Sequence, residues 1–150
     1  MDCIFCKIIE GDIPAKILKE TSQSVSFLDA FPLAKGHVLV IPKKHHQKIQ
    51  DMSQFENTDL FLLVHEMTSK VDSISGSTLV AIHNGIDAGQ EVPHVHVHLV
   101  PRSKNDSAGP IHSMFNSSLE LSESEVDEIY NKLKNRSEEH TSELQSHLNL

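Results

Sequence analysis

The stretch HVHVHLVPR (residues 94–102) carries a histidine at every second position over its first five residues. Successive side chains of a β-strand point to opposite faces, so this period predicts a strand with His94, His96 and His98 on one face. Neighbouring rings would lie about 6.6 Å apart, from a rise of about 3.3 Å per residue. The residues between them are apolar and would face a core; they are Val95, Val97 and Leu99. Three titratable rings in a row indicate a site of chemistry, because two charged rings would repel each other.

The segments around this stretch predict an α+β fold with a largely antiparallel sheet. Apolar runs bounded by turn residues indicate four further strands, at Ile17–Glu20, Ser24–Asp29, His37–Pro42 and Thr78–His83. One main helix is expected from Ser53 to about Asp72, because its apolar residues recur at helical spacing; they are Leu60, Leu63, Val64, Met67 and Val71. Such a sheet can bury one face under the helix and leave the other free for a ligand.

The C-terminal part predicts a short helix followed by a tail. The helix is expected to start at Ser122, with Glu125 completing a capping box. Its buried face would consist of Val126, Ile129, Tyr130 and Leu133. We expect the folded domain to span residues 1–135 and residues 136–150 to form a disordered tail, because that segment is polar. The tail also resembles translated sequencing-adapter sequence, which would make it foreign to the domain.

Length, charge and hydropathy narrow the class of protein. A chain of 150 residues fits one domain with a sizeable core. No run of about 18 apolar residues is present, so we expect no membrane-spanning helix and no membrane partner. The N-terminus has no basic region ahead of an apolar stretch, which favours a cytoplasmic protein. The net charge of −8, without a basic stripe, argues against a nucleic-acid partner.

The only two cysteines, Cys3 and Cys6, form the motif CIFC. In a cytosolic chain this spacing indicates a metal site or a redox pair before a structural disulfide. Zinc would need two further ligands, which the 11 histidines can supply. Two ordinary thiols are the alternative interpretation.

Two kinds of chemistry fit the histidine strand. Histidines on one face could bind a catalytic zinc. Alternatively, one imidazole is a nucleophile towards phosphorus and its neighbours donate hydrogen bonds. The preceding loop NGIDAGQ offers Gly85, Ala88 and Gly89, whose backbone N–H groups can approach an anion closely. This loop favours phosphate.

Taken together, these motifs resemble the histidine-triad (HIT) family of nucleotide hydrolases and transferases. The resemblance rests on CIFCKIIEGDIPAKI, SFLDAFPLAKGHVLVIPKKH and HNGIDAGQEVPHVHVHLVPR, and it covers roughly residues 2–101. It is closest to the small single-domain branch with an N-terminal C-x-x-C motif. It implies a nucleotide substrate, adenylyl compounds above all, and a homodimer whose sheet continues across both chains.

The resemblance also implies roles for individual residues. His96 would be the nucleophile that becomes nucleotidylated, His98 would contact the phosphate and leaving group, and His37 would support the phosphate pocket. Asp29 would accept hydrogen bonds from the ribose hydroxyls. The apolar lining of the base pocket would consist of Phe5, Ile8, Ile13, Phe27, Leu28 and Leu39.

The loop before the histidine strand departs from the usual family pattern. His83 stands where relatives usually have an asparagine that contacts phosphate or sugar, and the next residue, Asn84, is a possible substitute. The resemblance implies that Gly89 and Gln90 would also bind substrate. Glu91 occupies a position that is often a serine or threonine donor in relatives, although several bacterial-type relatives carry glutamate there; the resemblance implies that an acceptor near the leaving group changes substrate preference.

The resemblance assigns the CIFC motif to a structural zinc. Its ligands would be Cys3, Cys6, His45 and His94, a closed tetrahedral set without a position for substrate. His46 is the alternative to His45. With His94 in this site, the catalytic-zinc interpretation of the histidine strand loses a ligand. The leading function is therefore a hydrolase of nucleoside phosphoramidates or dinucleotide polyphosphates. The alternative is a zinc-stabilised nucleotide-binding partner protein with vestigial catalysis.

Overall fold

The computed structural model describes the backbone of residues 2–148 and the side chains of residues 2–135. The chain divides into two compact units, residues 1–106 and residues 107–150. The elements of the first unit are α1 (Ile4–Glu10), β1 (Ile17–Glu20), β2 (Ser24–Leu28), β3 (Val38–Pro42), η1 (Ile49–Asp51), α2 (Gln54–Ser75), β4 (Thr78–Ile82), η2 (Ile86–Ala88) and β5 (Val97–Pro101). The second unit holds η3 (Ile111–Met114) and α3 (Glu123–Leu148). In the described chain no helix has the length and hydropathy of a membrane span.

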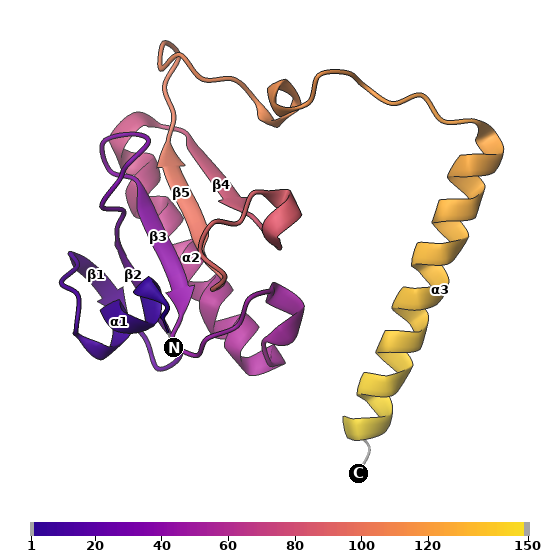
Figure 1. The fold of residues 1–150 in the computed structure, drawn as a ribbon, viewed down its shortest axis with the longest axis horizontal. Coiled ribbons are helices and arrows are strands. Elements are labelled where there is room, and N and C mark those ends of the chain that lie inside the picture. Colours follow the sequence, from indigo (N-terminus) through magenta and orange to yellow (C-terminus); the bar gives the residue numbers. More distant parts are fainter. Residues whose placement is uncertain (1, 149–150) are drawn as a thin grey trace. The chain divides into compact units, whose positions relative to one another are not determined.

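The first unit is an antiparallel sheet with strand order β1-β2-β3-β5-β4, which confirms the predicted α+β class (Figure 1). The five predicted strands are all present, with ends that differ from the prediction by a residue or more in four of them. Loops join β1, β2 and β3 in turn, whereas α2 lies between β3 and β4 and a long loop with η2 lies between β4 and β5.

The helix α2 covers one face of this sheet. Ser53 is its N-cap and forms a capping box with Glu56, so the helix begins one residue after the predicted start. All five residues of the predicted apolar stripe are buried. They pack in one core with Val95, Val97 and Leu99, which confirms that the apolar residues of the histidine stretch face the helix.

The other face of the sheet is partly covered by α1, a helix that the sequence analysis did not predict. Phe5 of α1 packs in a second core with Val25, Phe27, Leu39 and Ile41. Gly11 ends the helix with a φ of 86°, a left-handed conformation that a residue with a Cβ rarely adopts. The free face of the sheet is therefore reduced to the part beyond α1.

The histidine stretch is shorter as a strand than predicted, because β5 begins only at Val97. The backbone N–H of Val95 donates to His46 O, in the loop after β3, rather than to a strand. Pro42, at the end of β3, has no N–H for a ladder, and its carbonyl accepts a hydrogen bond from the His94 ring. Residues 94–96 therefore lie outside the paired part of the sheet. Val95 nevertheless packs in the same core as Val97 and Leu99.

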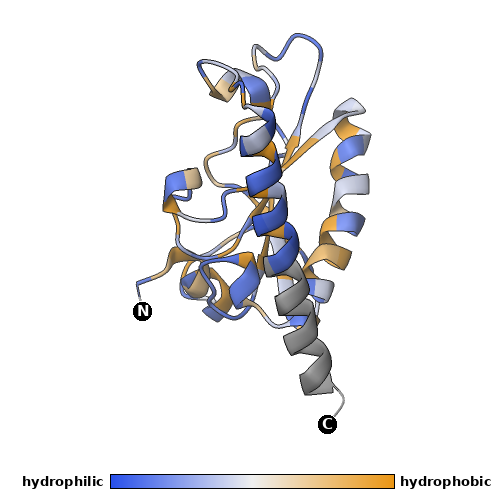
Figure 2. Cartoon of the chain, turned by 90° about the vertical axis from the view of Figure 1, so that its right-hand side faces the viewer, coloured by the Kyte–Doolittle hydropathy of each residue, from blue (hydrophilic) through white to orange (hydrophobic). Residues whose placement is uncertain are grey.

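The C-terminal helix differs from the prediction in burial and in length. Its side chains expected to be buried are exposed, between 43% for Ile129 and 61% for Leu133. The second unit contains only η3 and α3, which is too little chain to cover an apolar stripe. The described part of α3 is mainly hydrophilic, with some hydrophobic positions between (Figure 2).

The helix α3 starts one residue after Ser122, which forms the predicted hydrogen bonds with Glu125. It continues to Leu148, whereas we expected no regular structure after Asn135. Extending a helix costs little once it has started, and residues 136–148 contain neither glycine nor proline. Residues 149 and 150 of the predicted tail lie outside the described residues.

Candidate functional site

Four histidine rings gather beyond the edge of α1, on the sheet face opposite α2. The ring centroids of His96 and His98 are 4.9 Å apart, and those of His83 and His98 are 5.5 Å apart. His37, at the start of β3, places its Nε2 3.0 Å from Nδ1 of His98. The structure thus brings together the three predicted catalytic histidines and the residue that departs from the family pattern.

Hydrogen bonding assigns the proton of His96. Its Nδ1 lies 2.7 Å from the backbone oxygen of His94, and a carbonyl oxygen can only accept. We therefore place the ring proton of His96 on Nδ1, which leaves a lone pair on Nε2. Burial lowers the pKa of His96, so this ring is neutral at pH 7 and its Nε2 is available as a nucleophile.

Hydrogen bonds also show which ring nitrogens of His37 and His98 carry protons. The backbone N–H of Leu33 donates to Nδ1 of His37 at 3.0 Å, so the proton of that ring lies on Nε2. His37 Nε2–H then donates to Nδ1 of His98, and the remaining N–H of His98 is on Nε2. Burial, followed by the neighbouring ring of His96, lowers the pKa of His98 to about 4. His98 is consequently a neutral hydrogen-bond donor at pH 7.

A cavity of about 440 Å³ is lined by these four histidines. Asp29, directly after β2, lies at its wall; its carboxylate accepts a hydrogen bond from Phe31 N at 2.9 Å and approaches His37 Nε2 to 3.5 Å. Asp29 also lines a second cavity, of about 540 Å³, on the side of α1. The predicted ribose-binding carboxylate therefore stands where the two cavities adjoin.

The second cavity is predominantly apolar. All six residues predicted for the base pocket line it, namely Phe5, Ile8, Ile13, Phe27, Leu28 and Leu39. Three further lining residues were not predicted from the sequence. Ile4 and Phe31 line both cavities, and Leu33 lines the cavity of the histidines. Phe31 is 84% exposed, and an apolar side chain in the loop AFPLAKG was the signal that could have marked it.

Of the predicted site residues in the loop between β4 and β5, some line the cavity of the histidines and others point away from it. His83 and Gly89 line the cavity of the histidines, and a Cβ at Gly89 would approach His83 Cδ2 to 3.0 Å, so glycine permits the ring to lie there. Glu91 lines the same cavity. The proposed substitute Asn84 instead accepts from Ile49 N and donates to Gln50, which directs its side chain towards η1.

Gln90 also points away from the cavity. Its side chain is buried and donates from Nε2 to the backbone oxygen of Gln47 at 2.8 Å. Gln90 therefore ties its loop to the segment after β3, and its predicted contact with substrate has no support in this geometry.

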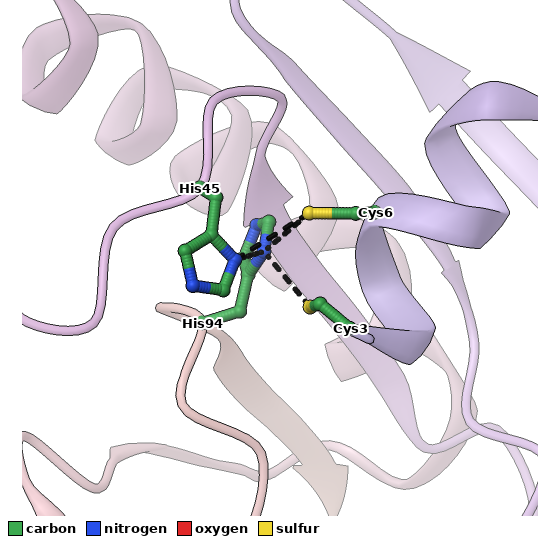
Figure 3. Close-up of side chains that lie close together, drawn as sticks. All are labelled: Cys3, Cys6, His45 and His94. Atoms are coloured by element: carbon green, nitrogen blue, oxygen red, sulfur yellow. Dashed lines mark hydrogen bonds between the residues drawn. The ribbon is translucent and has the colours of Figure 1, made fainter. Parts of the chain in front are cut away.

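A separate cluster joins the N-terminus to the histidine stretch (Figure 3). Nδ1 of His94 lies 3.5 Å from Cys3 Sγ, 3.7 Å from Cys6 Sγ and 3.2 Å from His45 Nδ1. Tetrahedral zinc with bonds of about 2.3 Å to sulfur and about 2.05 Å to nitrogen separates two nitrogens by about 3.3 Å, nitrogen and sulfur by about 3.6 Å and two sulfurs by about 3.8 Å. These four residues therefore have the spacing of a zinc site.

The proton pattern agrees with this metal site. His94 Nε2 donates to Pro42 O at 2.8 Å, so the lone pair of the neutral ring is on Nδ1, directed at the other three ligands. His46, the alternative ligand, instead contacts Glu56 through Nε2 at 3.0 Å. A second group of possible ligands, Asp29, His37 and His98, fits less well, because the Leu33 hydrogen bond leaves a proton on the His37 nitrogen that a metal would need.

Known proteins are similar to this chain in both sequence and fold. The family model for the HIT domain matches residues 10–105. The chain is 42% identical over 106 residues to an adenosine 5′-monophosphoramidase of Schizosaccharomyces pombe, covering 71% of this chain and 78% of the relative. It is 33% identical over 120 residues to an asymmetrical bis(5′-nucleosyl)-tetraphosphatase of the same organism, covering 79% and 65%.

Solved structures agree. A histidine triad nucleotide-binding protein from Candida albicans superposes with a TM-score of 0.78 and 31% identity, over 92% of this chain and 99% of that chain. A zinc-bound histidine triad family protein from Mycobacterium smegmatis superposes with a TM-score of 0.62 and 35% identity, over 71% and 79%. On the family model and these identities, the chain belongs to the HIT family.

Proposed function

We propose that this protein is a nucleotide hydrolase that forms a covalent nucleotidyl intermediate on His96. The observation that carries the proposal is the hydrogen bond from His96 Nδ1 to the His94 carbonyl, which leaves Nε2 as the unprotonated atom of a ring that lines the cavity. The names of the relatives, a phosphoramidase and a tetraphosphatase, support a nucleotide substrate.

The reaction proceeds in two displacements. His96 Nε2 attacks the α-phosphorus, a P–N bond forms, and the bond from phosphorus to the leaving group breaks. The His94 carbonyl stabilises the positive charge that develops on the His96 ring, and His98 Nε2–H is a donor for a phosphate oxygen. The leaving group departs with the electron pair of the broken bond and takes a proton from solvent. Water then attacks phosphorus and breaks the P–N bond: its oxygen stays on the released nucleotide, its proton passes to solvent, and the neutral ring of His96 is restored.

The nucleoside end of the substrate occupies the apolar cavity beside α1. Phe5, Phe27 and Leu39 supply a flat apolar environment for an adenine base. Asp29, where the two cavities adjoin, is an acceptor-only group that suits two adjacent ribose hydroxyls. The α-phosphate then falls among the histidines.

Replacing His96 by asparagine tests the mechanism. We expect turnover of an adenosine phosphoramidate to fall by orders of magnitude while nucleotide binding persists, because only the nucleophile is removed. His65→Asn, on the exposed side of α2, is the matched control. Mass spectrometry of quenched wild-type protein should show one added nucleotidyl group. Tight nucleotide binding without turnover by the wild-type protein would instead support the alternative function, a nucleotide-binding partner protein.

Cys3, Cys6, His45 and His94 would hold a structural zinc. All four positions are taken by protein ligands, so the metal would supply stability and orient His94, and no step of the reaction passes through it. Because His94 O accepts the hydrogen bond from His96 Nδ1–H, a fixed His94 also fixes the nucleophile.

A homodimer would form through β4. This edge strand has the sequence TLVAI without a charged residue, and Leu79 and Val80 are 40% and 46% exposed. The opposite edge, β1, carries Lys19, which pairs with Glu66. Charged residues discourage pairing at a sheet edge, so β4 is the edge that favours continuation into a second copy of the chain.

A further inference from the structure

The cavity of the histidines has a nucleoside end and an opposite end. Ile4, Phe5 and Asp29 also line the apolar cavity, whereas His83, Gly89 and Glu91 line only the cavity of the histidines. In a displacement at phosphorus the attacking and leaving atoms lie roughly in line. On the proposed function, a nucleoside beside α1 leaves the region of His83 and Glu91 for the leaving group.

The fixed charge in this cavity is negative. Its charged lining residues are the carboxylates Asp29 and Glu91, and neither lysine nor arginine lines it among the described residues. Lys35 and Lys48 belong to neighbouring loops and are absent from its wall. Burial lowers the pKa values of His37 and His98, so these two rings add no positive charge at pH 7.

Glu91 lines the same cavity as His96 and His98, so it lies at the wall of the space that the reacting phosphate and its leaving group would occupy. The side chain is exposed at the mouth of the cavity and has no ion-pair partner among the described residues. Gly89 lets its loop approach His83 closely, and Glu91, two residues further along that loop, lines the same cavity as His83.

We infer that Glu91 makes this site selective for leaving groups that carry a positive charge, such as an alkylamine with a second, free ammonium group. This inference rests on the proposed hydrolase function and names its substrate class: nucleoside phosphoramidates of cationic amines. A polyphosphate leaving group would meet the same carboxylate with like charge.

The test compares three adenosine 5′-phosphoramidates that share the scissile P–N bond. Their amines are a diamine with a free ammonium, butylamine, and β-alanine with a free carboxylate. For the wild-type protein we expect kcat/KM to fall in that order. From one compound to the next, kcat/KM should fall about two- to fivefold, which corresponds to the free energy of an exposed ion pair. Added salt should reduce the differences.

Variants assign the effect to the side chain. Glu91→Gln should give similar kcat/KM for all three compounds, and Glu91→Lys should reverse the order. Asp87→Gln, an exposed acid of η2 outside the cavity wall, should keep the wild-type order. Equal kcat/KM for all three compounds in the wild type, or an unchanged order in Glu91→Gln, would overturn this inference alone. Absence of turnover with every compound, or full turnover by His96→Asn, would overturn the proposed function instead.

Discussion

The Nε2–H of His37 donates a hydrogen bond to Nδ1 of His98, and the two nitrogens are 3.0 Å apart. The direction of this bond is set outside the pair, by the backbone N–H of Leu33, which donates to the other nitrogen of His37. A loop amide therefore decides which nitrogen of His98 presents its proton to the cavity.

His98 should titrate far below an ordinary histidine. Its pKa of about 4 lies below the usual value of about 6.5, so the unfolded chain binds a proton first as the pH falls. The associated stability is fully present above about pH 6.5 and is lost as the pH falls towards 4. NMR titration of the His98 ring measures the pKa directly.

Denaturant unfolding at several pH values provides the second measurement. The wild-type protein should lose more stability between pH 6.5 and 4 than His98→Gln, which lacks the titrating ring. A His98 pKa near 6.5, with parallel stability profiles for both proteins, would contradict the buried neutral state.

Asp29→Asn should weaken binding of ribonucleotides more than binding of 2′,3′-dideoxynucleotides. The carboxamide oxygen can still accept from Phe31 N, so the loop keeps its conformation while the charge-assisted bonds to ribose are lost. Such bonds are worth about 1.5–3 kcal/mol, and we expect about a tenfold or greater loss of affinity for the ribonucleotide. Calorimetry with AMP and its dideoxy analogue measures this, with Asp87→Asn as the control. If Asp29→Asn lowers the affinity for both ligands equally, Asp29 does not bind the ribose hydroxyls.

About one zinc per chain is expected in protein purified without chelator, bound by a four-ligand tetrahedral site. Plasma mass spectrometry measures the zinc content. His45→Ala should lose the metal, whereas His46→Ala should keep it, because the His46 ring contacts Glu56. Replacing both cysteines by serine should lower Tm and leave some hydrolysis. If the wild-type protein is fully stable without metal, Cys3 and Cys6 are ordinary thiols and the zinc site is wrong.

Zinc affinity should rise with pH. In the metal-free cluster, burial and the neighbouring Cys3 raise the pKa of Cys6 to about 11, so a thiol must release its proton before it binds zinc. Competition with a chelator at two pH values gives the sign of this effect.

Val80→Glu should convert a dimer into a monomer, because it places a charge on the uncharged edge strand β4. Leu18→Glu is the matched control: it makes the same change at a residue of similar exposure, 45% against 46%, on the opposite edge. Light scattering after size exclusion measures the mass of each variant. If only Leu18→Glu is monomeric, the dimer interface is at β1 and the assignment to β4 is wrong.

Local patterns in the sequence determined much of this fold. Helical spacing identified the buried stripe of α2, because a helix that covers a sheet must place apolar residues at every third or fourth position. Period two likewise separated Val95, Val97 and Leu99 from the histidines between them. The family motifs placed six apolar residues around one cavity, although each also had the pattern of ordinary core.

Only the tertiary structure decided what each polar side chain meets. The period alone does not distinguish His94 from His96; the family resemblance separated their roles, and the structure places the first ring against two cysteines from the N-terminus and the second at a cavity. Asn84 and Gln90 have the residue types of phosphate ligands, but contacts to Ile49 and Gln47 direct them elsewhere. A period along the chain specifies on which face a side chain lies. Its hydrogen-bond partners and pKa depend on atoms that are distant in sequence, and folding brings those atoms together.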